Sequence, residues 1–200
     1  MKKILTLLMT VLLTLCGFAS CKDDTESAKS YSRKYITHFD GYNQCIIFPA
    51  VTWDTTLHDG GKVINDWNVD KGFVSEGAGS IKVSVNEKAS DDTYWYKGRI
   101  EANNGFVSSI TDLNGATEIS LDVCNPNNVT IEVTIEIESA SATMISVTKS
   151  CLPRQWTTVS TIIEENDYDI VNWYSITLKN TTNKEPFTVY MDNFHIIFED

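Results

Sequence analysis

Strict alternation of apolar and polar side chains is the feature that most constrains the fold of this chain. From Val129 to Glu138, aliphatic residues occupy every odd position, and threonine and glutamate occupy the even ones. Because successive side chains of a strand point to opposite faces, this segment predicts a half-buried antiparallel strand with an acidic solvent side. Residues 80–85 and 118–123 alternate in the same way. Beyond the first twenty residues the sequence has no sustained helical period, so it predicts an all-β protein.

Turn residues separate these segments from further predicted strands at 36–40, 94–102, 143–149, 157–163, 174–179 and 187–198. Residues 125–128 (Asn-Pro-Asn-Asn) form a turn, and all four prolines lie between predicted strands, where a missing N–H costs little. In the last strand the apolar residues change parity between Met191 and Phe194, which predicts a bulge near Asp192-Asn193. About nine or ten short strands joined by turns indicate a sandwich or a barrel.

The N-terminus carries the pattern of an export signal. Lys2 and Lys3 precede an apolar stretch, residues 4–18, that is too short for a comfortable membrane span. Small residues then lead to Cys21, and this arrangement resembles a bacterial lipobox, although Phe18 stands where leucine is usual. The resemblance implies that Cys21 is acylated, and two or more acyl chains hold a protein stably on a membrane. The alternative is an ordinary signal peptide with a coincidental cysteine.

The residues after Cys21 extend this interpretation. Lys-Asp-Asp at 22–24 resembles the acidic signal with which Bacteroidetes-type bacteria place lipoproteins on the outer face of the outer membrane. The chain is therefore divided into a signal peptide (1–20), a flexible polar tether (21–34) and one domain (35–200). Without residues 1–20 the chain keeps 14 basic and 27 acidic residues, a net charge of −13. This charge disfavours nucleic acid and anionic lipid headgroups, since both need basic surfaces.

Three further cysteines, Cys45, Cys124 and Cys151, leave two possibilities open. Three thiols cannot all pair internally, so the domain contains either one disulfide and one free thiol or three buried thiols. The sequence has no CxxC motif and no Cys/His spacing typical of a zinc site.

The order of several segments resembles that of the galactose-binding-like jelly rolls, a group that includes many carbohydrate-binding modules. The segments are 38–41 (His-Phe-Asp-Gly), 76–85 (Glu-Gly-Ala-Gly-Ser and a strand), 119–126, 155–159 and 189–196. Together they span roughly residues 36 to 198 and imply an antiparallel β-sandwich, a jelly roll of the galactose-binding-like type.

The resemblance also implies a structural calcium ion. The matching ligand positions are Asp40, the loop from Glu76 to Ser80, and Asp192. Calcium takes six to eight oxygen ligands, and a glycine-containing loop can turn its carbonyls inward. The alternative is that Asp40 and Asp192 only satisfy backbone amides at strand ends.

Aromatic residues on predicted strands are the candidates for contact with sugar rings. Tyr94, Trp95 and Tyr96 are consecutive, so they cannot all face the core. Trp173 is expected opposite the apolar face of its strand, beside small hydroxyl residues, and Arg99 is a candidate polar partner. Outward rings form a stacking platform or, alternatively, pack under a loop.

Other tryptophans receive different interpretations. In the resembling family, the position of Trp156 packs against the sandwich, so we expect it in the core. Trp53 and Trp67 lie in the least regular stretch, residues 41–72, a long loop region of the kind that often binds ligands.

The sequence therefore predicts a non-catalytic surface lipoprotein that binds glycan or polysaccharide through its domain. The alternative is a structural or adhesive subunit that docks another envelope protein, and a glycoside hydrolase-related enzyme is a third possibility. The sequence contains no Gly-x-Ser-x-Gly elbow, phosphate loop or His-Glu-x-x-His helix. The glutamates of 129–138 are interpreted as a solvated face.

Overall fold

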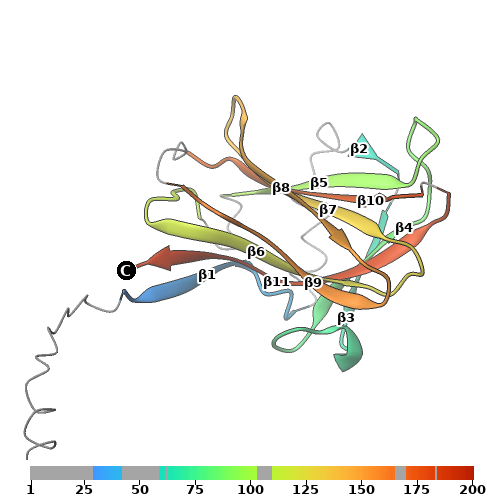
Figure 1. The fold of residues 1–200 in the computed structure, drawn as a ribbon, viewed down its shortest axis with the longest axis horizontal. Helices are drawn as coiled ribbons and strands as arrows, with labels where there is room; N and C mark the ends of the chain where they lie inside the picture. The colour runs from blue at the N-terminus through green and yellow to red at the C-terminus, as the bar shows by residue number, and fades with distance from the viewer. Residues whose placement is uncertain (1–28, 42–58, 62, 103–109, 165–169, 183) are drawn as a thin grey trace, which may run out of the picture.

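The fold is an antiparallel β-sandwich, which confirms the predicted fold class. A computed structural model describes residues 29–41, 59–61, 63–102, 110–164, 170–182 and 184–200. These residues form eleven strands and one short 3-10 helix, Lys71–Phe73. The strands form two antiparallel sheets that face each other (Figure 1). No helix in the described ranges is long and apolar enough to cross a membrane.

Sheet A has the strand order β3-β4-β11-β6-β9, and β1 also pairs with β11. The first half of β11 pairs with β4 and the second half with β1, so β1 lies beside β11 at the end of the molecule that carries the C-terminus (Figure 1). The strands are β1 (Tyr31–Thr37), β3 (Val63–Asn68), β4 (Ser80–Val85), β6 (Ala116–Asn125), β9 (Gln155–Ile162) and β11 (Phe187–Glu199).

Sheet B has the strand order β2-β5-β10-β7-β8. Its central strand, β10, pairs from Trp173 to Lys179 with β5 on one side and along its whole length with β7 on the other. The strands are β2 (Asp59–Gly60), β5 (Trp95–Glu101), β7 (Ile131–Glu138), β8 (Thr143–Cys151) and β10 (Trp173–Asn180).

The inner faces of the two sheets make one hydrophobic core. The odd-numbered residues of β7 are fully buried, as the alternation predicted, and they belong to the same core cluster as the inner residues of β6. Burial of each large aliphatic side chain contributes about 1.5–3 kcal/mol. The core residues include Ile81, Val83, Ile119, Leu121, Val123, Ile131, Val133, Ile135, Ile137, Tyr174, Ile176, Leu178, Phe194 and Ile196.

A bulge interrupts β11 at the predicted place. Asp192 is opposite Asp122 and His195 is opposite Ser120, so β11 has one residue more than β6 between the two pairs. Asn193 has a φ of 54°, the left-handed conformation that asparagine tolerates better than most residues. The bulge keeps both halves of β11 in the core despite their different parity.

Two parts of the fold differ from the sequence prediction. The first strand begins at Tyr31, so residues 31–34, predicted as tether, pair with the end of β11. The stretch 41–72, predicted as irregular, contains β2 and β3. β3 escaped prediction because Asn and Asp, which are depleted in strands, make up half of its six residues. Its pairing with β4 stabilises it all the same.

The described cysteines are free thiols. Cys124 and Cys151 are both buried and unpaired, and Cys45 lies outside the described residues. Burial raises the pKa of Cys151 to about 11 and also raises that of Cys124. Both thiols are therefore protonated and shielded near neutral pH, as expected for inert structural cysteines.

Candidate functional site

The outer face of sheet B gathers three of the five residues predicted to bind carbohydrate. In β5, Trp95 and Arg99 point outward, whereas Tyr96 is buried at 2% exposure. Tyr94, just before the strand, packs against the core. Two of the predicted contacts, Tyr94 and Tyr96, are therefore turned away from this face, because the strand can present only one parity outward.

In β10 the alternation is as predicted. Tyr174 and its inward partners are buried, and Trp173 lies on the outer face with Ser175 and Thr177. Trp95 is opposite Lys179, and Trp173 is opposite Glu101. The two indoles are thus offset by six residues along neighbouring strands, or about 20 Å at about 3.4 Å per residue.

Small hydroxyl residues lie on this face beside the two indoles, most of them on β7 and β8. Thr177 is opposite Thr134, and Thr134 is in turn opposite Thr148. The hydroxyl oxygens of Thr134 and Thr148 are 2.7 Å apart. On β7 and β8 these short side chains leave the surface low, whereas between the two tryptophans the long side chains of Lys97 and Arg99 cross β10 over the buried Ser175. The outer hydroxyl residues of sheet B are Thr134, Ser146, Thr148, Ser150, Ser175 and Thr177.

A network of ion pairs crosses this face. Lys97 and Arg99 on β5 reach over β10 to glutamates on β7: the Lys97 Nζ lies 3.0 Å from Glu138 and also contacts Glu136, and Arg99 Nη2 lies 2.8 Å from Glu138. The hydroxyl of Ser175 donates to Glu138 Oε1 at 2.6 Å. The Glu138 side chain is only 6% exposed. The interpretation of these glutamates as a solvated face is thus wrong for Glu138, which is the hub of the network.

The network keeps Lys97 charged and holds the Arg99 guanidinium in place next to Trp173. Burial opposes the charge on Lys97, but its hydrogen bonds to Glu136 and Glu138 outweigh this effect and raise the pKa of Lys97 above its ordinary value. The Arg99 guanidinium lies over the Trp173 ring, 5.5 Å from its centroid. Cation–π contacts of this kind contribute about 0.5–2 kcal/mol. This contact holds the Trp173 indole and the Arg99 guanidinium next to each other on the outer face of sheet B.

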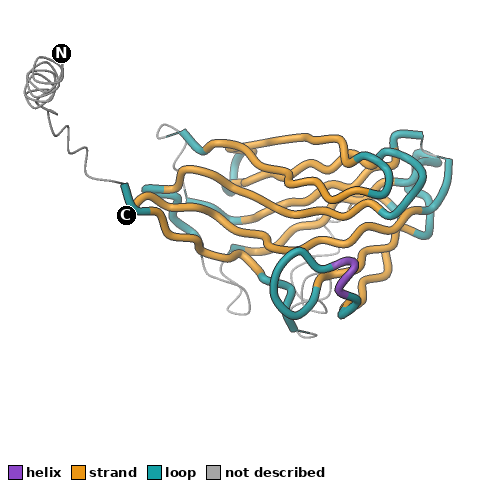
Figure 2. Tube along the Cα trace, turned by 60° about the horizontal axis from the view of Figure 1, so that its bottom comes forward, coloured by secondary structure: helices purple, strands orange, loops and turns teal. Residues whose placement is uncertain are grey.

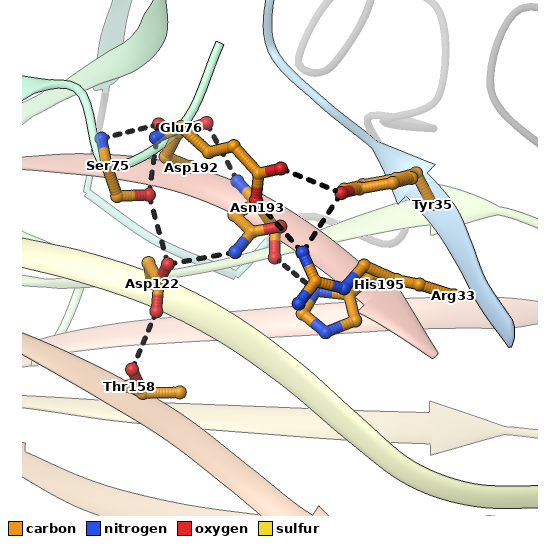
Figure 3. Close-up of polar contacts among 9 residues, drawn as sticks. All are labelled: Arg33, Tyr35, Ser75, Glu76, Asp122, Thr158, Asp192, Asn193 and His195. Atoms are coloured by element: carbon orange, nitrogen blue, oxygen red, sulfur yellow. Dashed lines mark hydrogen bonds and ion pairs between the residues drawn. The ribbon is translucent and has the colours of Figure 1, made fainter. Parts of the chain in front are cut away.

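The outer face of sheet A carries a second polar cluster, centred on Asp192 (Figure 3). One carboxylate oxygen of Asp192 accepts hydrogen bonds from the amide of Ser75 at 2.8 Å, the hydroxyl of Ser75 at 3.1 Å and the amide of Glu76 at 3.0 Å. The other oxygen accepts from the amide of Asn193 at 2.8 Å. Asp192 is completely buried, so it fastens the loop after the 3-10 helix to β11. Figure 2 shows that helix (purple) outside the strands of the sandwich.

Asp122 on β6 continues the cluster. It accepts hydrogen bonds from Thr158 at 2.7 Å and from the side-chain amide of Asn193 at 3.0 Å, and it shares the single hydroxyl proton of Ser75, at 3.0 Å, with Asp192 (Figure 3). On the other side, Glu76 accepts from Arg33 at 2.9 Å and from Tyr35 at 3.2 Å. Beside the cluster is a cavity of about 190 Å³, lined by Tyr35, His38, Asp40, Glu76, Gly77, Asp192 and Asn193.

The residues predicted to hold calcium lie at or near this cavity, and their polar atoms make hydrogen bonds and an ion pair within the protein. Asp40 accepts from the amides of Ala78 and Gly79, and Asp192 from the amides described above. The hydroxyl of Ser80 donates to the carbonyl of Phe73, and Glu76 pairs with Arg33. Within the described ranges, no three acidic, His or Cys side chains are grouped to hold a metal. The contacts match the alternative, in which Asp40 and Asp192 satisfy amides, and calcium binding stays a prediction.

Two other tryptophans are placed by the structure. Trp156 is not in the core: at 36% exposure it lies on the outer face of β9, because Thr157 and Val159 take the inward positions. Trp67, expected in a binding loop, packs from β3 against the core. Trp53 lies outside the described residues.

His195 lies in the sheet A cluster as a buried imidazole. Its Nδ1 is 2.8 Å from the carbonyl oxygen of Asn193, and the centroid of the Tyr35 ring is 5.7 Å from its own. Burial lowers the pKa of His195 below its ordinary value of 6.5, and the hydrogen bond to Asn193 offsets only part of this effect.

The lowered pKa of His195 predicts a pH dependence of stability. The unfolded chain takes up a proton at higher pH than the folded one, so stability present above pH 6.5 is lost as the pH falls below that value. We expect His195→Gln to show a shallower fall in Tm than the wild type between about pH 7.5 and pH 5.5. Burial raises the pKa of Asp192, which acts with the opposite sign at lower pH, but this contribution is common to both proteins and cancels. Parallel Tm curves would contradict the expectation.

Comparison with known proteins supports the fold alone. No protein-family model matches the sequence, and no curated protein is similar to it. Among solved structures, the carbohydrate-binding module TmCBM61, in complex with β-1,4-galactotriose, has a TM-score of 0.53 at 9% identity, covering 84% of this chain and 99% of that one. The arabinose-bound MgGH51 α-L-arabinofuranosidase has a TM-score of 0.52 at 12% identity, covering 83% of this chain and 26% of the enzyme.

An exo-β-agarase is similar at a TM-score of 0.53 and 8% identity, with 84% of this chain and 25% of the enzyme covered. This chain thus spans about a quarter of the length of the two enzymes but nearly the whole of the module. It has the β-sandwich fold of a carbohydrate-binding module.

Proposed function

We propose that the protein is a non-catalytic, cell-surface lipoprotein that binds glycan through the outer face of sheet B. The observation that carries this proposal is the placement of Trp95, Arg99 and Trp173 on one outer face, beside the short hydroxyl residues of β7 and β8. A sugar ring presents an apolar C–H face that an indole can cover, and hydroxyls that Ser, Thr, Arg and Glu can bond. The similarity to a module solved with a galactotriose supports the same proposal.

The ion pairs favour a neutral glycan. Lys97 and Arg99 are already paired with Glu136 and Glu138, so neither cation is left to neutralise a uronate or sulfate. The net charge of the exported chain, −13, also opposes polyanions. Uncharged glycans are not repelled by this negative charge.

The same pairs favour binding over catalysis. Glu136 and Glu138 lie two residues apart on one strand, and both are held by Lys97. A glycosidase needs two carboxyl groups on opposite sides of the scissile bond, one of them available as an acid. Among the described residues, the outer face of sheet B offers a surface for a chain, and its two paired glutamates lie on the same strand and not across a cleft.

Anchoring belongs to the proposal as well. Cys21, outside the described residues, is the expected acylation site, and the Lys-Asp-Asp sequence after it supports export to the outer face of the outer membrane. The chain would then retain polysaccharide or host glycan at the cell surface.

The test is binding of the chain from Lys22 onward to immobilised neutral and acidic polysaccharides, with and without calcium. We expect retention on at least one neutral polysaccharide, and a loss of about tenfold or more for Trp95→Ala and Trp173→Ala, since 1.4 kcal/mol corresponds to a factor of ten. Ile162→Ala, at an exposed apolar residue of sheet A, is the control. Retention on none, together with a stoichiometric protein partner from outer membranes, would instead favour the docking function.

A further inference from the structure

Trp156 lies on the opposite side of the sandwich from the proposed glycan face. It is opposite Cys124 of β6, and Cys124 is opposite Tyr190 of β11, so the three side chains adjoin on the outer face of sheet A. The Tyr190 ring stacks on Phe73, with centroids 4.2 Å apart. Phe73, Trp156 and Tyr190, over the buried Cys124, make an apolar surface, and these four residues are here called the Trp156 patch. The indole of Trp156 is the most exposed of these four side chains and is not part of the hydrophobic core.

Two hydroxyl groups adjoin the Trp156 patch. Thr158 follows two residues after Trp156 on the same face, and Ser75 lies on the loop that Asp192 fastens (Figure 3). Both residues are exposed. The Thr158 hydroxyl donates to Asp122 at 2.7 Å, and the Ser75 hydroxyl shares its proton between Asp122 at 3.0 Å and Asp192 at 3.1 Å. Since each hydroxyl has a single proton, their outward lone pairs remain as acceptors. The site therefore offers the hydroxyl oxygens of Thr158 and Ser75 as hydrogen-bond acceptors, next to the carboxylate of Asp122 and the exposed indole of Trp156.

This chemistry selects a class of ligand. Acceptors backed by a carboxylate repel anions and bind hydroxyl donors, and the indole covers an apolar ring face. A purely apolar partner would leave the polar groups of Asp122, Thr158 and Ser75 buried without new hydrogen bonds, which is costly. A neutral sugar can cover the Trp156 indole with its apolar ring face and donate hydroxyl hydrogen bonds to Thr158 and Ser75.

We propose that the Trp156 patch, with Thr158 and Ser75, is a second contact site for neutral glycan. The inference rests on the proposed function but uses none of the residues of sheet B. Two sites on opposite faces would let one domain hold two polysaccharide strands, or two stretches of one strand. Retention on an immobilised polysaccharide would then exceed the affinity of either site alone.

The experiment follows the indole N–H resonances of the chain from Lys22 onward by NMR, assigned by single Trp→Phe variants. Soluble β-1,4-galactan, xylan and mixed-linkage β-1,3-1,4-glucan are the probes. We expect a polysaccharide that shifts Trp95 or Trp173 also to shift Trp156. Trp156→Ala and Thr158→Val should each weaken retention on the immobilised polysaccharide by about tenfold or more through lost avidity. Ile162→Ala, an exposed apolar residue on the same strand, should leave retention unchanged.

The outcomes separate the two sites. Shifts of Trp95 and Trp173 with a silent Trp156, and unchanged retention in Trp156→Ala, would overturn the second site and leave the sheet B site standing. A shift of Trp156 alone would support the second site and overturn the first. Silence of all three indoles with every probe would overturn both. Thermal unfolding of each variant distinguishes loss of binding from loss of fold.

Discussion

Replacing Glu138 with alanine is expected to destabilise the domain by about 2 to 4 kcal/mol. Its carboxylate is the shared partner of Lys97 and Arg99 and accepts the hydroxyl of Ser175, so the substitution leaves Arg99 and the Ser175 hydroxyl without this partner and Lys97 with Glu136 alone. Removal of one partner from a fully buried pair costs about 3–5 kcal/mol. The two cations keep about a fifth of their exposure, and solvent therefore reduces the penalty.

Urea unfolding of Glu138→Ala and Glu132→Ala provides the comparison. Glu132 is on the same strand and the same outer face, and it makes no ion pair in the described part of the chain, so its replacement should change stability by less than about 0.5 kcal/mol. The double variant Arg99→Met/Glu138→Ala should recover part of the loss, because the cation that lost its ion pair is gone. Equal effects for Glu138 and Glu132 would show that the network is not a structural unit.

The same substitution should also weaken glycan binding. Glu138 holds Arg99 by one nitrogen while the guanidinium lies over the Trp173 ring. Without the carboxylate, Arg99 is free to move away from the Trp173 ring. Binding of the glycan must then order the two side chains, and this ordering reduces the affinity. At a temperature where both proteins are folded, Glu138→Ala should bind neutral polysaccharide less tightly than Glu132→Ala.

Local pattern was enough to predict most strands of this fold. The alternation of 129–138 places four aliphatic residues in the core, and the parity change in 187–198 locates the bulge at Asp192-Asn193. Both features depend only on the two-residue period of a strand. β3 was missed because its stability comes from pairing with β4 and not from its own composition.

The site was less predictable, because its contacts join residues far apart in the sequence. Alternation alone predicts that Trp173 faces outward, but it left the outward parity of β5 open, and only the strand order β5-β10-β7 brings Arg99 to Glu138. For the same reason, the sequence did not show that Glu138, the last of the outward glutamates in 129–138, pairs with both Lys97 and Arg99. Trp156 was misplaced because the resemblance assigned it inward, whereas the neighbouring Val159 sets the opposite parity of β9.

Replacing Asp192 with alanine is expected to destabilise the domain by about 3 kcal/mol or more. The carboxylate is completely buried and accepts the amides of Ser75, Glu76 and Asn193 together with the Ser75 hydroxyl. Hydrogen bonds to a charged group contribute about 1.5–3 kcal/mol each, and orphaned amides add a desolvation penalty. Loss of native packing around the carboxylate is a further, smaller term.

Graded variants test this account of Asp192. Asp192→Asn keeps one acceptor oxygen but turns an NH₂ group toward donors, so its loss of stability should be smaller than that of the alanine variant. Asp122→Ala removes an acceptor of three side-chain donors and of no backbone amide, and it should cost less than either. Hydrogen exchange should show the amides of Ser75 and Glu76 losing protection in Asp192→Ala before the strands of sheet B do, because the carboxylate is what joins that loop to β11. Protection that fell evenly across both sheets would mean that Asp192 supports the whole core, and not the loop that carries Ser75.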